Sequence, residues 1–251
     1  MQNRNKPPER ILSKLDEYLH RNDYAAAERH LLYWLGEAEQ VGDGATELTV
    51  RNELMGLYRK LGRGEEALDC VDAALKKINS MNIGDQVGSA TTYLNSATVY
   101  KAFGRAEEAI PLFEAARKIY EKNLDPDDGR LGGLYNNMAL ALVDLGRFDE
   151  AKVLYSKAIS VMEKQERGAL EVAITYLNLA TAAEAERGLE NADEPIQKYL
   201  ELAESLLESF EERDGYYAFV CEKCASVFGY YGWFVYENEL KERSKRIYEG
   251  N

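Results

Sequence analysis

The sequence is poor in residues and patterns that mark several common protein classes. Only 5 prolines and 19 glycines occur among 251 residues, which argues against a turn-rich sandwich or barrel and favours long helices. No stretch approaches the ~18 uncharged apolar residues of a membrane span. The 3 cysteines are too few for a disulfide framework, and the N-terminus has no secretory signal pattern. Together these features predict a reduced, cytoplasmic protein.

Positive charge is also scarce. The chain has 31 Lys and Arg residues against 44 Asp and Glu residues, for a net charge of −13. An acidic chain of this kind lacks the basic surface that binds nucleic acids or anionic membranes. We therefore expect neither nucleic acid nor membrane among its partners.

Patterns that support catalysis or metal binding are missing. The 2 histidines leave little general-base capacity, and no GxxxxGK[ST], GxGxxG, HExxH or GxSxG motif occurs. Asp125 begins a segment similar to a calcium loop, but its twelfth position is Asn136 instead of the required Glu. Cys221 and Cys224 have CxxC spacing, yet no other cysteine or nearby histidine completes a zinc site. We predict a non-enzymatic protein with no cofactor and no metal.

An internal repeat is the strongest positive signal. Three segments share a Gly-Arg dipeptide followed by an acidic pair and alanine: 61–67, 103–109 and 145–151. Their glycines, Gly62, Gly104 and Gly146, lie 42 residues apart. The same step reaches His20 in a degenerate first copy and Gly188 in a fifth, and a sixth copy lies near Gly232. About six such units account for nearly the whole chain, which predicts one elongated domain.

Each unit has the pattern of two helices around the glycine. Small and large apolar residues recur at spacings of three and four on both sides of the turn, which is typical of an amphipathic helical hairpin. Glycine supplies the left-handed conformation that commonly ends a helix. The alanines expected to pack lie five and twelve residues after the turn, namely Ala25, Ala67, Ala109, Ala151, Ala74, Ala116 and Ala158, whereas Leu32 replaces alanine in the first unit.

These columns resemble the tetratricopeptide repeat. The 42-residue period exceeds the usual ~34 residues and is similar to the long-helix subclass found in kinesin light chains, as are the blocks 124–129 and 135–139. The resemblance implies an all-α, right-handed superhelical solenoid of about six antiparallel helix pairs. It would span residues 9–251 after a flexible tail at 1–8, with units near 9–43, 44–85, 86–128, 129–168, 169–212 and 213–250.

The resemblance further implies that the first helices of the units line a concave groove. Asn95, Asn137 and Asn178 lie nine, nine and ten residues before the turn glycine. Neighbouring helices pack about 8–10 Å apart and an extended peptide advances about 3.3 Å per residue, so one asparagine would meet every third ligand residue. A side-chain amide pairs with a peptide N–H and C=O together. The alternative, in which these asparagines tie adjacent helices together, stays open.

Other residues are candidates to tune such binding. Flanking groove positions are Asn136, Thr98, Lys101, Leu140, Asp144 and Thr181, and secondary groove charges are Arg59, Lys60 and Lys223. A column of arginines at the turns could pair with acidic residues or contact a partner: Arg21, Arg63, Arg105, Arg147 and Arg187. The C-terminal unit is dense in aromatics, which form either a packed cap or an interface, and the candidates are Tyr230, Tyr231, Trp233 and Phe234.

The leading functional hypothesis is a cytoplasmic adaptor that holds an extended peptide or protein tail in its groove by an asparagine ladder. A second is an assembly subunit that self-associates, for example as a homodimer, through the aromatic C-terminal unit. A third is a peptide-sensing regulator, although the sequence shows no DNA-binding or effector module.

Overall fold

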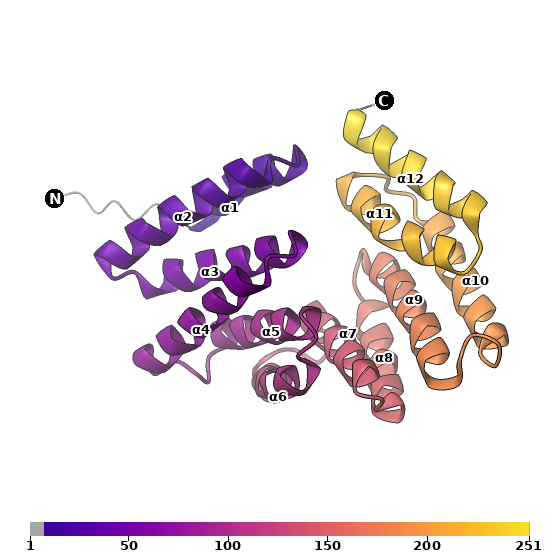
Figure 1. The fold of residues 1–251 in the computed structure, drawn as a ribbon, viewed down its shortest axis with the longest axis horizontal. Coiled ribbons are helices and arrows are strands. Elements are labelled where there is room, and N and C mark those ends of the chain that lie inside the picture. Colours follow the sequence, from indigo (N-terminus) through magenta and orange to yellow (C-terminus); the bar gives the residue numbers. More distant parts are fainter. Residues whose placement is uncertain (1–7, 251) are drawn as a thin grey trace. The chain divides into compact units, whose positions relative to one another are not determined.

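A computed structural model describes residues 8–250 of the chain. Within that range the chain forms twelve α-helices and no strand. The helices follow one another as antiparallel hairpins, which Figure 1 shows clearly for the last two pairs. This confirms the predicted all-α fold of about six helix pairs. The helices are α1 (Pro8–His20), α2 (Tyr24–Val41), α3 (Gly44–Lys60), α4 (Gly64–Met81), α5 (Val87–Ala102), α6 (Ala106–Asn123), α7 (Gly129–Asp144), α8 (Phe148–Met162), α9 (Gly168–Arg187), α10 (Asp193–Ser209), α11 (Gly215–Tyr230) and α12 (Phe234–Glu249).

The chain divides into two compact units, one ending at Asn123 and the other starting at Leu124. The first contains α1–α6 and the second α7–α12, three hairpins each. That all six hairpins form one solenoid domain stays a prediction. The predicted tail at 1–8 lies outside the described residues except for Pro8, which begins α1. Proline suits this first helical position because its missing N–H would have no partner there.

The repeat columns form the cores of both units. The alanines five and twelve residues after the turn glycine are at most 1% exposed. The large residues between them, Val71, Phe113 and Tyr155, are fully buried. Small side chains let the two helices of a hairpin approach closely, and the large ones fill the space beside them. The two helices of each of these hairpins therefore pack in a defined register against each other.

The turn glycines adopt the predicted left-handed conformation. Gly62, Gly104, Gly146 and Gly232 have φ values between 70° and 87°. In the first hairpin the prediction of His20 as the turn residue was wrong, because Asn22 adopts φ 53° instead. Asparagine is among the few residues that tolerate this conformation.

The packing residues of the first hairpin shift together with its turn. Ala27, five residues after Asn22, is fully buried, whereas the predicted Ala25 is exposed. Arg21 of the predicted arginine column lies in the turn between α1 and α2, one residue before Asn22. In the fifth hairpin the predicted longer loop is present at 188–192, and Pro195 lies in the first turn of α10.

Candidate binding site on the first helices

Within each unit, first helices of neighbouring hairpins contact one another. Helix α3 contacts α5 in the first unit, and α9 contacts both α7 and α11 in the second. We call the side chains that meet along these contacts the first-helix face of each unit. The predicted groove residues lie on these helices.

In the first unit, the first-helix face is tied together by polar side chains. The Asn95 Nδ2 donates to the Oδ1 of Asn52 at 3.2 Å, which joins α5 to α3. The Asn52 Nδ2 in turn donates to the hydroxyl of Thr92 at 3.0 Å. Asn52 was not among the predicted site residues. Its position ten residues before Gly62 matches that of Asn178 before Gly188, and this spacing is the signal that could have identified it.

The second unit has the same kind of contact between α7 and α9. The Asn178 Nδ2 donates to the Oδ1 of Asn136 at 3.1 Å, whereas the Asn137 Nδ2 donates to the Gly133 carbonyl of its own helix at 2.8 Å. Two of the three predicted rungs, Asn95 and Asn178, therefore link neighbouring helices. Every amide still has a second N–H, so peptide contact by these residues stays a prediction.

The flanking candidates differ in their contacts and in their exposure. The hydroxyls of Thr98 and Thr181 donate to the carbonyls of Leu94 and Leu177, one turn back in their own helices. The Lys60 ammonium lies 5.0 Å from the ring centre of Tyr24. The other candidates are half-buried at Lys101 and Leu140 and exposed at Asp144, Arg59 and Lys223.

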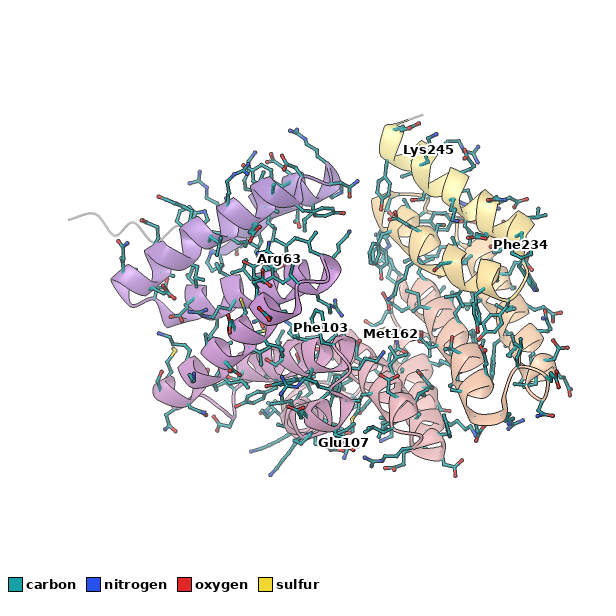
Figure 2. All side chains as sticks on the ribbon, viewed as in Figure 1. Arg63, Phe103, Glu107, Met162, Phe234 and Lys245 are labelled. Atoms are coloured by element: carbon teal, nitrogen blue, oxygen red, sulfur yellow. The ribbon has the colours of Figure 1, made fainter. Side chains whose placement is uncertain are left out.

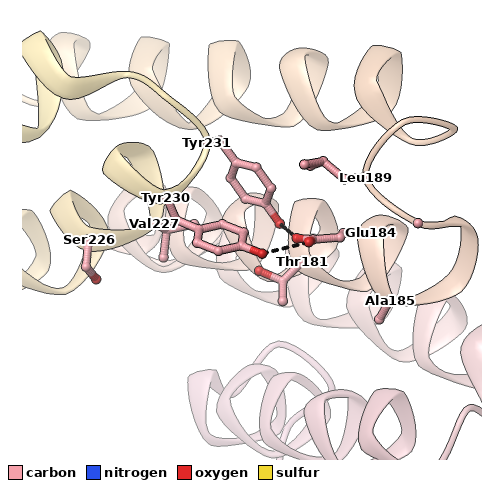
Figure 3. A pocket seen from close by; sticks show the side chains of 9 residues that line it. Thr181, Glu184, Ala185, Leu189, Ser226, Val227, Tyr230 and Tyr231 are labelled. Carbon is pink, nitrogen blue, oxygen red and sulfur yellow. Dashed lines mark hydrogen bonds between the residues drawn. The ribbon is translucent and has the colours of Figure 1, made fainter.

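A pocket of about 610 Å³ opens between α9 and α11. Figure 3 shows its side chains, which come from the end of α9, the following loop and the end of α11. The pocket is lined by three of the predicted site residues. Thr181 was predicted as a groove position, and Tyr230 and Tyr231 as interface residues. The remaining lining residues are Glu184, Ala185, Gly188, Leu189, Ser226 and Val227. A volume of this size lies within the ~300–1,000 Å³ typical of ligand sites.

The carboxylate of Glu184 is the polar centre of this pocket. Tyr230 donates its hydroxyl to Oε1 at 2.7 Å, and Tyr231 donates to Oε2 at 2.7 Å, as the dashed lines in Figure 3 show. The bond to Glu184 raises the pKa of Tyr230. Burial, followed by the bond to Glu184, raises the pKa of Tyr231. Both phenols therefore stay protonated and orient the carboxylate as donors.

Charged contacts fix the opposite end of the α9–α11 junction. The Arg167 guanidinium pairs with Asp214 at 2.6 Å, and Tyr216 donates its hydroxyl to Glu171. Asp214 also caps α11 by accepting the backbone N–H groups of Tyr216 and Tyr217. The bond from Arg167 and those backbone bonds hold the pKa of Asp214 below its ordinary value. The position of α11 against α9 therefore depends on ionised groups.

The aromatic residues that follow α11 have three different environments. Trp233 donates its Nε1–H to Gln197 at 3.0 Å and packs against Phe228, whose ring centre is 5.5 Å away. Tyr230 and Tyr231 line the pocket described above. Phe234 is 64% exposed at the start of α12, where Figure 2 labels it. It lines a second hollow of about 430 Å³ on that helix.

The arginines at the turns pair mainly within their own hairpins. Arg63, Arg105 and Arg147 each contact the glutamate three residues later. Arg63, labelled in Figure 2 at the turn between α3 and α4, also pairs with Glu28 of the preceding hairpin at 2.8 Å. Surface pairs of this kind contribute about 0–1 kcal/mol each, and they help to fix the turns.

No group of three or more metal-ligating side chains occurs among residues 8–250. Within the same range, no helix combines the length and apolar character needed to cross a membrane. The cysteines are buried and unpaired. Burial raises the pKa of Cys70 to about 11 and that of Cys224 to about 12, so both are protonated thiols at neutral pH.

The hairpin cores and the first-helix contacts define a helical-repeat scaffold of the kind that generally mediates protein interactions without chemistry. The sequence profile of the tetratricopeptide repeat family matches residues 46–122 and 130–205, more than half of the chain. The chain belongs to this family.

Solved structures show the same fold. The chain is similar to a protein of Podosopora anserina described as a candidate kinesin light chain with nearly identical TPR-like repeats. The two are 19% identical with a TM-score of 0.55, over 81% of this chain and 95% of that one. It is also similar to BtubC (BKLC) from P. vanneervenii, at 19% identity and a TM-score of 0.66, over 81% of this chain and 82% of that one. No curated protein sequence matches the chain significantly.

Proposed function

We propose that this protein is a non-catalytic, cytoplasmic adaptor that binds an extended segment of a partner protein along the first-helix face. The observation that carries the proposal is the pocket between α9 and α11, which is open and lined by both polar and apolar groups. A pocket between two first helices gives an extended chain a fixed anchoring point.

The asparagines extend this surface beyond the pocket. Asn178 lies one helical turn before Thr181 on α9, so a chain anchored in the pocket would continue past it. In the proposal Asn95, Asn137 and Asn178 use their remaining amide groups to pair with the ligand backbone. Thr98, Lys101, Asn136, Leu140, Asp144 and Thr181 then select side chains, with Arg59, Lys60 and Lys223 as secondary charges.

Site-specific photo-crosslinking tests this proposal. A benzophenone amino acid replaces Ser226 at the pocket or Glu201 on the exposed side of α10. We expect a partner from lysate to crosslink at position 226 and not at 201, and to be displaced by a short peptide from its own sequence. If a folded Asn137→Ala/Asn178→Ala variant no longer crosslinks this partner, the asparagines are part of the binding site. Equal crosslinking at 201 and 226, or no displacement by peptides, would contradict the proposal.

A second candidate function is that of an assembly subunit. Phe234 and its neighbour Val235, 64% and 76% exposed, form an apolar surface beside the second hollow. Exposed apolar surface of this kind is typical of contact sites. Light scattering at increasing concentration tests it: a dimer that Phe234→Ser converts to a monomer would support homodimerisation, and a monomer throughout would exclude it.

A further inference from the structure

We infer that the pocket between α9 and α11 recognises a lysine or arginine side chain of the bound segment. This inference rests on the proposed function, and it specifies the chemistry of the ligand that the anchoring point accepts.

The pocket has a negatively charged wall. Among residues 8–250, Glu184 is the only charged residue that lines the pocket, and no lysine or arginine of that range lines it. Within the described part of the chain its hydrogen-bond partners are the two tyrosine hydroxyls. A carboxylate has about four acceptor positions, so two positions remain for a ligand. Neutral hydroxyls orient the carboxylate but leave its charge uncompensated.

A neighbouring glutamate shows the contrast. Glu186, two residues further along α9, pairs with Lys152 at 2.6 Å and with Arg187 at 3.2 Å. Its charge is therefore compensated within the protein. Glu184 has no such partner in the described residues, and the pocket is where an external cation can reach it.

The walls of the pocket fit the rest of a basic side chain. Tyr230 is 69% exposed and offers its ring to the pocket, and Val227, Ala185 and Leu189 supply apolar surface. Lysine and arginine combine an apolar stem with a charged head, and a cation is attracted to an aromatic face. The stem would pack on these walls while the head reaches Glu184.

Other side chains match this pocket less well. An acidic side chain would be repelled by Glu184. An apolar side chain would displace water from the carboxylate without offering a donor or a positive charge, which is unfavourable. A basic side chain satisfies both the carboxylate and the apolar walls.

The experiment uses capped heptapeptides of serine and alanine with one central residue: lysine, arginine, norleucine or glutamate. The full-length protein is labelled with ¹⁵N-tyrosine, and the amide signals of Tyr230 and Tyr231 are assigned by single Tyr→Phe variants. We expect saturable shifts of both signals with the lysine and arginine peptides, with a Kd of about 1 mM. The norleucine and glutamate peptides should bind at least about tenfold more weakly.

Charge variants then locate the contact. Glu184→Gln keeps an acceptor oxygen but removes the charge. It should weaken the binding of the lysine peptide by about tenfold. Glu201→Gln changes the net charge equally on an exposed face of α10 and should leave binding unchanged. Glu184→Asp keeps the charge and should retain the preference for lysine over norleucine. Thermal unfolding by circular dichroism checks that each variant is folded.

Three results would overturn the inference: equal binding of the norleucine and lysine peptides, no effect of Glu184→Gln, or no shift with either basic peptide. Failure of this inference can be distinguished from failure of the proposed function. If position 226 crosslinks a peptide-displaceable partner but lysine is not preferred, only the ligand chemistry is wrong. If that crosslink is also absent, the anchoring site itself is wrong.

Discussion

Helix α9 lies between two junctions that are built differently. On one side, Asn178 of α9 is joined to Asn136 of α7 by a neutral amide–amide bond. On the other side, α9 meets α11 through the Arg167–Asp214 ion pair at one end and Glu184 with its two tyrosines at the other. Among the described residues, those that line the pocket belong to the second junction.

In the proposal, this difference lets one helix take part in both a structural and a binding junction. An amide pair engages a donor of one helix with an acceptor of the next, so part of its hydrogen-bonding capacity is already used. A carboxylate held by hydroxyls keeps both its charge and free acceptor positions. In the proposal, the charge of Glu184 makes the α9–α11 junction available to a ligand. The lowered pKa of Asp214 makes the same junction sensitive to acid.

The largest effect should come from removing the core of the α9–α11 junction. Phe228 is fully buried among residues of α9–α12, so Phe228→Ala should lower the free energy of unfolding by about 3–5 kcal/mol. Phe234→Ala, at an exposed ring in the same aromatic run, should change it by less than about 0.5 kcal/mol. Urea unfolding monitored by circular dichroism compares the two, and similar losses would show that Phe234 is also part of the core.

The next largest effect concerns α9 itself. A Cβ at Gly168 would overlap the backbone carbonyl of Met162. Gly168→Ala should therefore displace the start of α9 and lower the free energy of unfolding by about 1–3 kcal/mol. At Gly133 in α7, no atom of the described residues outside the local helix backbone lies within 4 Å of an added Cβ. Gly133→Ala should therefore stabilise the helix by about 0.5–1 kcal/mol. Unfolding free energies that change in the same direction for both variants would contradict this packing.

A smaller effect is expected at the cap of α11. Asp214→Ala removes the acceptor of two backbone N–H groups. It should lower the free energy of unfolding by about 0.5–2 kcal/mol at pH 7. The pKa of Asp214 lies below its ordinary value of 3.8 in the folded protein, so this stabilisation is complete above about pH 4 and is lost as the pH falls further. Asp214→Asn keeps a cap, and it should remove this contribution to acid sensitivity. An unchanged slope of stability against pH below pH 4 in Asp214→Asn would refute the assignment.

The smallest effect on stability should come from the Asn136–Asn178 contact between α7 and α9. A double-mutant cycle of Asn136→Ala and Asn178→Ala should give a coupling of about 0.5–1.5 kcal/mol in unfolding free energy. Because both groups are neutral, the coupling should be the same at pH 4 and pH 7. A coupling near zero would mean that the asparagines are free for other contacts, which favours the peptide ladder.

Most of the fold was predictable because the repeat constrains the same few positions in the second, third and fourth hairpins. A buried alanine and a left-handed turn glycine recur in the second, third and fourth hairpins, as at Ala67 and Gly62. The first hairpin shows the limit of counting residues. Asn22 replaces glycine at a shifted position, so a fixed step of 42 led to His20 instead.

The site was predictable only in part, because a pocket depends on contacts between separate helices. Thr181, Tyr230 and Tyr231 were identified from their repeat position or aromatic character, but their meeting point was not. Glu184 was missed because 44 acidic residues give no reason to select one. Its distinction arises from two tyrosines more than forty residues away. That no cation of the described residues lines its pocket is likewise a property of the folded chain.

The way in which Glu184 is held also bears on the kinetics of binding. Hydroxyl donors leave the negative potential of the carboxylate in place before any ligand arrives, and the net charge of −13 adds to it. Such a field accelerates the approach of a basic segment, and salt screens it over about 10 Å at 0.1 M. Rising ionic strength should therefore slow the association of a basic ligand far more than it shortens the lifetime of the complex.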